Sequence, residues 1–245
     1  MSRQPFGGAT TGFSRITGIA ALGFASLIVL ANAIIVPAGL PLTGADVGEV
    51  SAFFGTGSDA VAVSSALTPA AWLLATLFGA GAVSVLRRSE RDRGEAWSLL
   101  GFTGLALQNA TFAAVIATRL ALTSTGASGD TATGALWALH DALFTLNGTF
   151  LALALIGLSV AGRRAGLIRP WHGALGLTSA ALLFTSATLA PLVVDQAGPL
   201  GLLGLSGWLL WVAWIVAYGV ALIRLSPSSS SSFPSPSSPS DPVTA

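Results

Sequence analysis

The sequence predicts an all-α membrane protein, a bundle of about six transmembrane helices with both termini in the cytoplasm. Three observations support this: an apolar composition, six segments long enough to cross a bilayer, and arginines that gather in alternate connections. Of the 245 residues, 53% are hydrophobic and 9% are charged, whereas roughly 25% of the residues in a soluble domain are charged. A soluble fold has no place for so much apolar surface.

Charge and cysteine usage exclude several classes of function. The net charge is +1, so no basic field points to a nucleic-acid partner. The chain has no cysteine, which excludes disulfides, thiolate metal sites and cysteine nucleophiles. Every basic residue is arginine rather than lysine. With abundant Ala and Gly, this usage is typical of GC-rich bacterial genomes and favours a bacterial inner membrane.

Each predicted span holds about 20 or more apolar residues with few charges, the length that an α-helix needs to cross the hydrocarbon core. Barrel strands are shorter and alternate between lipid-facing and lumen-facing residues, a pattern absent from these segments. Residues 1–15 are predicted to be a cytoplasmic segment, 16–225 the transmembrane domain, and 226–245 a disordered Ser/Pro-rich cytoplasmic tail. The spans are Ile16–Pro37, Val61–Leu86, Ala96–Leu122, Ala135–Ala161, Trp171–Val194 and Leu200–Leu225.

The arginines set the predicted orientation, because positively charged loops stay on the cytoplasmic side of a membrane. The first, third and fifth connections are acidic instead, with Arg119 as their basic neighbour. Both termini are therefore predicted to be cytoplasmic in a multi-pass protein of the cell membrane. The arginines of the cytoplasmic side are Arg3, Arg15, Arg87, Arg88, Arg91, Arg93, Arg163, Arg164, Arg169 and Arg224; the acidic residues of the other side are Asp46, Glu49, Asp59, Asp130 and Asp195.

Two alternatives stay open near the N-terminus. Ala31-Asn32-Ala33 is a small-x-small sequence after an apolar run, as in a cleavable signal peptide. Cleavage would leave five spans, but the apolar run continues to Val36, which favours a spanning helix. In the long connection 38–60, Val47, Val50, Phe53 and Phe54 recur at helical spacing, so this segment is either a short interfacial helix or an ordinary loop.

The order of these features resembles a group of bacterial proteins. The chain combines six spans, a long first external connection, an Arg-rich second connection and an aromatic start to the fifth span. This arrangement is similar to uncharacterised six-helix actinobacterial integral membrane proteins, a resemblance that implies membrane location and helix count but no activity. The residues that carry it are Ala135-Leu136-Trp137-Ala138-Leu139-His140, Gly157-Leu158-Ser159, Gly166-Leu167-Ile168-Arg169-Pro170-Trp171 and Gly173-Ala174-Leu175-Gly176.

Polar side chains inside the spans are the candidate site, because ionisable groups there are costly unless they are paired or hydrated. Gln108 and Arg119 lie about 20° apart on one face of their helix. On the next span, His140 and Asn147 share a face. We name as the candidate outer polar cluster the residues Arg119, His140, Asp141, Gln108, Asn109, Asn147 and Asn32.

Two hypotheses account for this cluster. In the first, Arg119 and Asp141 pair within an outward-open polar pocket, and His140 titrates near neutral pH. In the second, which we favour, Arg119 reaches the surface, His140 and Asp141 lie at the membrane interface, and the amides join neighbouring helices by hydrogen bonds. The sequence identifies no catalytic residue.

The remaining candidate features favour structural roles. The two histidines, His140 and His172, fall near opposite membrane faces, so a shared haem is not expected, and no metal or other cofactor motif is present. Small residues suit close helix approach. Indoles at helix starts suit the headgroup region, whereas the aromatic residues of the last span favour core packing or lipid contact over a ligand groove. The small residues are Gly79, Gly81, Gly101, Gly104, Gly173 and Gly176; the indoles are Trp97, Trp137 and Trp171; the last-span aromatics are Trp208, Trp211, Trp214 and Tyr218.

Three function classes follow from the sequence. The first is a membrane scaffold or accessory protein that binds lipids, partner membrane proteins or further copies of itself. The second is a transporter or small-molecule receptor that uses the outer polar cluster. The third is a membrane-embedded enzyme acting on a lipid, for which His140 and Asp141 are the available acid/base pair. The absence of a catalytic constellation in the sequence favours the first class.

Overall fold

The computed structural model describes residues 9–125, 131–195 and 200–225, and within these ranges it contains helices and no strand. The all-α prediction is confirmed. The predicted tail and Asp130 lie outside the described residues. The helices are α1 (Ala9–Ile35), α2 (Val47–Thr56), α3 (Ser58–Ala66), α4 (Thr68–Arg91), α5 (Trp97–Thr125), α6 (Thr131–Arg164), α7 (Pro170–Thr188), α8 (Ala190–Asp195) and α9 (Gly201–Ile223).

Five helical stretches are long and apolar enough to cross a membrane, which supports the prediction of a membrane protein. They coincide with five of the predicted spans and extend most of them by a few residues. The helix α1 already includes Ala9, the first described residue, and so covers part of the segment that was predicted to precede the first span. The stretches are Gly12–Ile35, Ser58–Arg91, Trp97–Thr125, Thr131–Arg164 and Gly201–Ile223.

The predicted span Trp171–Val194 is not among these five stretches, because it is divided between α7 and α8. The division falls at Leu189, just before Pro191. A proline has no backbone N–H to donate, and its ring crowds the carbonyl four residues earlier, so a helix is interrupted there. The structure leaves α7 with 19 residues, close to the minimum of roughly 17 for a membrane crossing.

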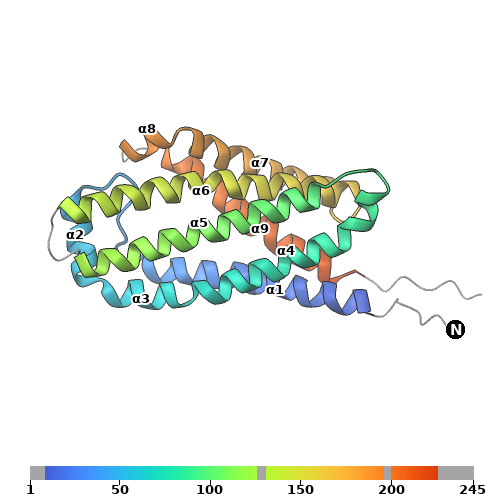
Figure 1. Cartoon of the computed structure of the whole chain (residues 1–245), viewed down its shortest axis with the longest axis horizontal. Coiled ribbons are helices and arrows are strands. Elements are labelled where there is room, and N and C mark those ends of the chain that lie inside the picture. The colour runs from blue at the N-terminus through green and yellow to red at the C-terminus, as the bar shows by residue number, and fades with distance from the viewer. Residues whose placement is uncertain (1–8, 126–130, 196–199, 226–245) are drawn as a thin grey trace, which may run out of the picture.

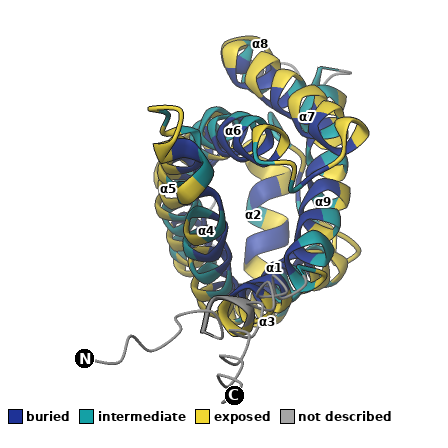
Figure 2. Cartoon of the chain, turned by 90° about the vertical axis from the view of Figure 1, so that its right-hand side faces the viewer, coloured by how far each residue is buried: buried dark blue, intermediate teal, exposed yellow. Residues whose placement is uncertain are grey.

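The long helices lie side by side along one axis (Figure 1). The helix α1 packs against α4 and α9, α5 packs against α6, and α7 packs against both α6 and α9. Viewed along that axis, the helices form a ring whose buried residues face inward (Figure 2). The exposed residues of the long helices include many large apolar side chains, such as Leu73, Leu202 and Leu209. Such a surface suits contact with lipid rather than water.

The helices α5 and α6 approach each other through glycine. A Cβ atom added at Gly104 would lie 2.5 Å from the backbone nitrogen of Ala154 and 2.8 Å from the carbonyl oxygen of Phe150. Gly101 and Gly157 face each other in the same seam, where either Cβ would meet the backbone of the partner helix. Small residues let membrane helices pack this closely, as expected from the sequence.

Aromatic side chains of α9 fill the interior. Trp211 packs edge-on against Phe24, with ring centroids 5.5 Å apart, and Tyr218 packs against Phe78 at 5.6 Å. Trp211, Trp214 and Tyr218 are all buried. The core-packing interpretation of these residues is therefore confirmed. The interior at this level is filled by side chains from α1, α4 and α9.

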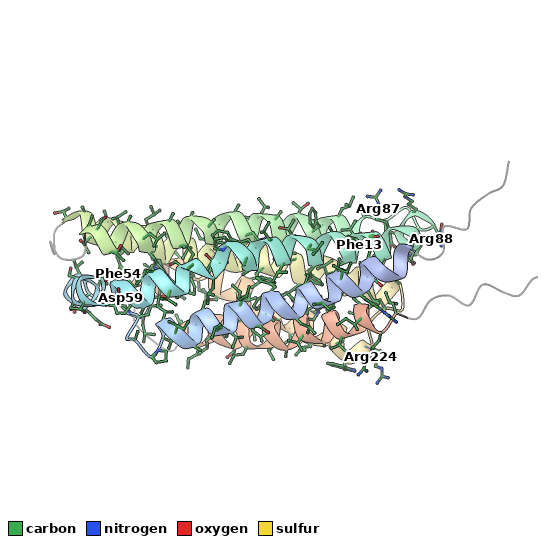
Figure 3. All side chains as sticks on the ribbon, turned by 90° about the horizontal axis from the view of Figure 1, so that it is seen from below. Phe13, Phe54, Asp59, Arg87, Arg88 and Arg224 are labelled. Atoms are coloured by element: carbon green, nitrogen blue, oxygen red, sulfur yellow. The ribbon has the colours of Figure 1, made fainter. Side chains whose placement is uncertain are left out.

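The two ends of the bundle differ in charge (Figure 3). We call one the arginine-rich end: it holds Arg87, Arg88, Arg163, Arg164, Arg169 and Arg224. We call the other the cap end: it holds the connection after α1, the helix α2 and the start of α3. At this end α2 is confirmed as a helix, with the Asp46 carboxylate accepting a hydrogen bond from the Glu49 amide at 3.0 Å. Its apolar face, with Phe53 and Phe54, is buried against Leu122 and Trp137.

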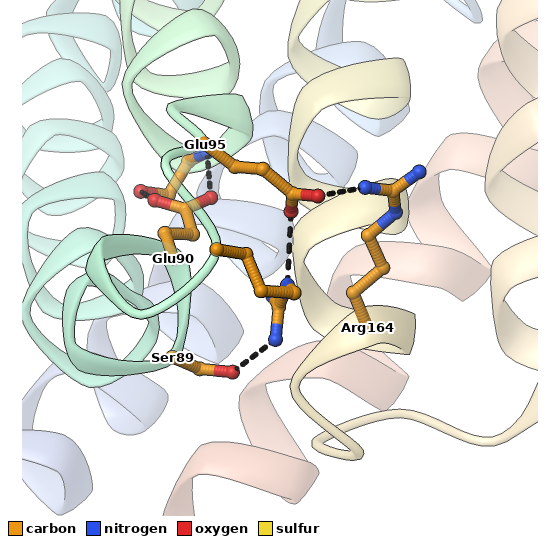
Figure 4. A network of polar contacts seen from close by, with 6 residues as sticks. Ser89, Glu90, Glu95 and Arg164 are labelled. Carbon is orange, nitrogen blue, oxygen red and sulfur yellow. Dashed lines mark hydrogen bonds and ion pairs between the residues drawn. The ribbon is translucent and has the colours of Figure 1, made fainter.

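A polar network fixes the connection between α4 and α5 at the arginine-rich end (Figure 4). The buried Glu90 carboxylate accepts hydrogen bonds from the Ser98 amide at 2.6 Å and the Ser98 hydroxyl at 2.5 Å. Glu95 forms ion pairs with Arg93 and Arg164. These contacts tie the start of α5 to α4 and to the end of α6.

Candidate functional site

A chain of polar contacts joins α5, α6 and the connection after α1 near the cap end. The Arg119 Nε group donates to His140 Nε2 at 3.0 Å, and His140 Nδ1 lies 3.0 Å from Asp141 Oδ1. Arg119, His140 and Asp141 expose only 7%, 3% and 1% of their surfaces. We call this the Arg–His–Asp chain.

The contacts assign the proton on His140. A guanidinium has hydrogen-bond donors and no acceptor, so His140 Nε2 must offer its lone pair to Arg119. The proton then resides on Nδ1, which donates to the Asp141 carboxylate. A neutral imidazole therefore bridges a cation and an anion. Both ring nitrogens are occupied by these two partners.

Aromatic rings hold the imidazole in place. Trp137 stacks on His140 with ring centroids 4.6 Å apart and an interplanar angle of 9°. Phe144 stacks at 6.0 Å and 7°. These three residues recur at helical spacing on α6, so the helix itself sets the stack. The indole of Trp137 is buried against Phe54 and His140, so it does not face outward as a headgroup anchor would.

Asp141 connects the chain to the cap end. Its Oδ2 atom accepts a hydrogen bond from the Gly44 amide at 2.8 Å. Gly44 has a φ of 84°, a left-handed conformation that favours glycine. The carboxylate thus bonds to His140 through one oxygen and to the cap through the other. The contact fixes the long connection directly against α6.

The arrangement differs from both sequence hypotheses. Within the described residues no ion pair joins Arg119 directly to Asp141, because His140 lies between them. The three side chains are neither in an open pocket nor at a wetted helix end, since the cap end covers them. What the sequence placed correctly is the shared location of these residues on α5 and α6.

Two further cluster residues lie on the same inward faces. Gln108 of α5 and Asn147 of α6 are buried, and Gln108 Oε1 and Asn147 Oδ1 have no hydrogen-bond partner. The indole nitrogen of Trp137 is also buried and unpartnered. Leaving a buried polar group unpaired costs about 1–3 kcal/mol. Ordered water is the usual partner of such groups.

The other two cluster residues lie elsewhere. Asn32 donates to the carbonyl of Ile28 on its own helix at 2.9 Å. Asn109 turns toward α4, where its Nδ2 group lies 3.4 Å from the Trp72 carbonyl oxygen and 3.5 Å from Thr76 Oγ1. The predicted seven-residue cluster is therefore divided: five members share the α5–α6 interior, and Asn32 and Asn109 do not.

Gly44 and Glu90 were not identified by sequence reasoning. Gly44 contributes a backbone amide, which no side-chain pattern reveals. Glu90 lies within a run of arginines in the second connection, a pattern that predicts a solvent-exposed charge. The available signal was its spacing from Ser98: the two residues lie on either side of a short turn between two spans, where a carboxylate can cap the start of the next helix.

The histidines do not converge. His140 belongs to the Arg–His–Asp chain near the cap end, whereas His172 Nε2 lies 2.9 Å from the Trp214 carbonyl oxygen near the start of α7. Among the residues that the structure describes, no group of three or more His, Cys, Asp or Glu side chains is arranged to hold a metal ion.

Comparison with known proteins adds no relative. No family model, no curated protein and no solved structure matches the chain.

Proposed function

We propose that the chain is a membrane-embedded accessory protein. In this proposal it is a closed helical bundle that contacts lipids and the spans of partner membrane proteins, and it neither converts a substrate nor carries one through its interior. The observation that carries the proposal is the Arg–His–Asp chain: its charged groups are buried, bonded to one another and fastened to the cap end through Gly44. A charged group that bound a substrate would need a hydrogen-bonding position that the protein itself leaves free.

The filled interior supports the same proposal. Trp211, Trp214 and Tyr218 of α9 occupy the space between α1, α4 and α6. A transport path needs a polar or hydrated route past such a layer. The large apolar residues of this chain that remain exposed lie on the outside of the bundle, where lipids and other membrane helices would meet them.

The orientation and the number of crossings are part of the proposal. We place the arginine-rich end in the cytoplasm, and with it both termini, because basic connections stay inside. In that arrangement α7 and α8 together supply a sixth crossing beside the five long apolar stretches. The bacterial inner membrane and the resemblance to six-helix actinobacterial proteins remain predictions.

A receptor or transporter for a small polar molecule is the second candidate. The observation that favours it is the unpartnered state of Gln108 Oε1, Asn147 Oδ1 and Trp137 Nε1 in the interior. A ligand with both donors and acceptors would satisfy these atoms. We rank this candidate second because the described residues around the atoms are buried, and bound water would satisfy the atoms equally well.

The geometry gives less support to an enzyme that acts on lipids. General acid/base catalysis needs a ring nitrogen within hydrogen-bond reach of the substrate. Both nitrogens of His140 are already bonded, one to Arg119 and one to Asp141. Catalysis by this pair would require the chain of contacts to break first.

Native mass spectrometry of the full chain, extracted from its own membrane in mild detergent, tests the proposed function. We expect a membrane protein or a defined set of phospholipids to be retained at fixed stoichiometry. An unrelated multi-span protein expressed in the same cells serves as the control for nonspecific lipid. Retention of a small polar molecule instead would favour the receptor candidate. Release of a bare monomer without lipid would contradict the accessory proposal.

A further inference from the structure

Two arginines lie on either side of the short turn that joins α6 to α7 at the arginine-rich end. Arg163 belongs to the last turn of α6, and Arg169 is the N-cap residue of α7. Hydrogen bonds from the Leu167 and Ile168 amides to the Gly162 carbonyl oxygen, at 2.9 and 3.3 Å, fix the turn between them. Ile168 is buried. The turn is therefore held against the core, with one arginine at each end of it.

The side chain of Arg163 crosses from α6 to α7. A Cβ atom added at Gly173 would overlap Arg163 Cδ and would lie 3.3 Å from Arg163 Nε. The arginine stem thus lies against α7 at a position where the glycine leaves room for it. Gly173 and Arg169 are four residues apart, about one helical turn, so they lie on the same face of α7. The two arginines therefore share one side of the seam between α6 and α7.

The positive charge of these two side chains is not neutralised within the described part of the chain. Arg163 and Arg169 are exposed, and neither forms an ion pair there. The adjacent Arg164 differs, because it pairs with Glu95 (Figure 4). Asp92 lines a pocket with the middle of the same turn but forms an ion pair with neither arginine. The turn between α6 and α7 thus presents two guanidinium groups without an anionic partner.

Apolar side chains lead away from these arginines along both helices, which lie side by side (Figure 1). On α6, Ile156 and Val160 precede the arginine at helical spacing and are partly exposed. On α7, Leu177 and Phe184 continue the face of Gly173 and are exposed. The surface therefore combines two cations at the end of the bundle with apolar side chains directed toward its middle. An amphiphile with an anionic headgroup has the same distribution of charge and apolar surface.

We propose that Arg163 and Arg169 bind the phosphate group of an anionic phospholipid whose acyl chains lie along α6 and α7. This inference rests on the proposed accessory function and names the class of lipid that the protein contacts. A guanidinium can donate two parallel hydrogen bonds to a phosphate. A zwitterionic headgroup brings its own ammonium group, so two unpaired arginines favour a lipid with a net negative charge. Basic pockets between membrane helices on the cytoplasmic side are known to bind such headgroups.

Titration of the purified full chain with phosphatidylglycerol, followed by native mass spectrometry, tests this site. Phosphatidylcholine, whose net charge is zero, should bind more weakly. Arg163→Gln and Arg169→Gln should each weaken phosphatidylglycerol binding by about 5-fold, the equivalent of about 1 kcal/mol for each basic residue near an anionic surface. Binding of phosphatidylcholine should stay unchanged in both variants. Equal affinities of the natural chain for the two lipids would overturn the proposal.

Arg164→Gln is the matched control. It removes the same charge from the next position, but this guanidinium already pairs with Glu95. Phosphatidylglycerol binding should therefore remain at the level of the natural chain. An equal loss of binding in Arg164→Gln and Arg163→Gln would mean that only the total charge of this end matters, and it would overturn the assignment of the site.

Inorganic phosphate distinguishes a lipid site from a phosphate site. An excess of phosphate at constant ionic strength should leave the bound phosphatidylglycerol in place, because the acyl chains contribute contacts that phosphate lacks. Displacement of the lipid by phosphate would overturn the lipid as the ligand. A protein that retains a partner membrane protein but binds both lipids equally would overturn this inference and leave the accessory function standing.

Discussion

Arg119→Ala and Asp141→Ala should each lower the free energy of unfolding by about 3–5 kcal/mol, the usual cost of leaving one buried charge without its partner. Each substitution removes one end of the Arg–His–Asp chain and leaves the opposite charge under the cap end. His140→Ala should have an effect of the same order, because it separates Arg119 from Asp141 without removing either charge.

The double variant distinguishes a coupled chain from independent polar residues. Arg119→Ala with Asp141→Ala should cost clearly less than the sum of the two single changes, since neither charge then remains unpaired. Denaturation of the purified proteins in detergent measures the free energy of unfolding of the two single variants and of the double variant. Asp59→Ala is the control: it removes an exposed carboxylate at the same end and should leave stability unchanged. Small and additive effects would mean that the chain of contacts does not form.

Gly104→Ala is expected to have the second large effect. Its added Cβ would lie 2.5 Å from the Ala154 nitrogen and 2.8 Å from the Phe150 carbonyl oxygen. Both are backbone atoms, so α5 and α6 must move apart. Overpacking costs about 1–3 kcal/mol and sometimes more, and we expect a value near the upper limit.

A second glycine gives the control, a substitution by alanine that is not expected to lower stability. Gly12 lies in α1 with no atom within 4 Å of an added Cβ. Alanine is favoured over glycine in a helix by about 1 kcal/mol, so Gly12→Ala should be neutral or stabilising. Thermal melting of the two variants side by side measures the difference. Equal melting temperatures would contradict the close approach of α5 and α6.

The helices could be predicted from the sequence because lipid imposes a length and a composition on each span. The same regularity placed Gln108 and Arg119 on one face of α5, and His140 and Asn147 on one face of α6. Helical periodicity relates residues of one helix to each other. It does not say which neighbouring helix a face meets. The sequence therefore could not predict that Asn109, one residue after Gln108, packs toward α4 instead of α6.

The contacts of the candidate site required the tertiary structure. His140 and Asp141 are adjacent, and adjacent side chains of a helix diverge by about 100°. The sequence left open whether Arg119 pairs with Asp141 or reaches the surface, and neither hypothesis placed His140 between them. In the structure the imidazole faces Arg119 and the carboxylate reaches both the imidazole and Gly44. The Gly44 contact spans 97 positions of sequence, beyond any local pattern.

Single-cysteine labelling tests the closed bundle most directly. Intact cells expressing Asp59→Cys, Arg87→Cys or Asn147→Cys are treated with a membrane-impermeant maleimide. Asp59→Cys should be labelled from outside, and Arg87→Cys only after the membrane is permeabilised. Asn147→Cys should stay protected in both conditions until the protein is denatured, because the interior is closed beneath the cap end. Rapid labelling of Asn147→Cys from outside would contradict the closed bundle and favour a receptor or transporter with an outward-open site.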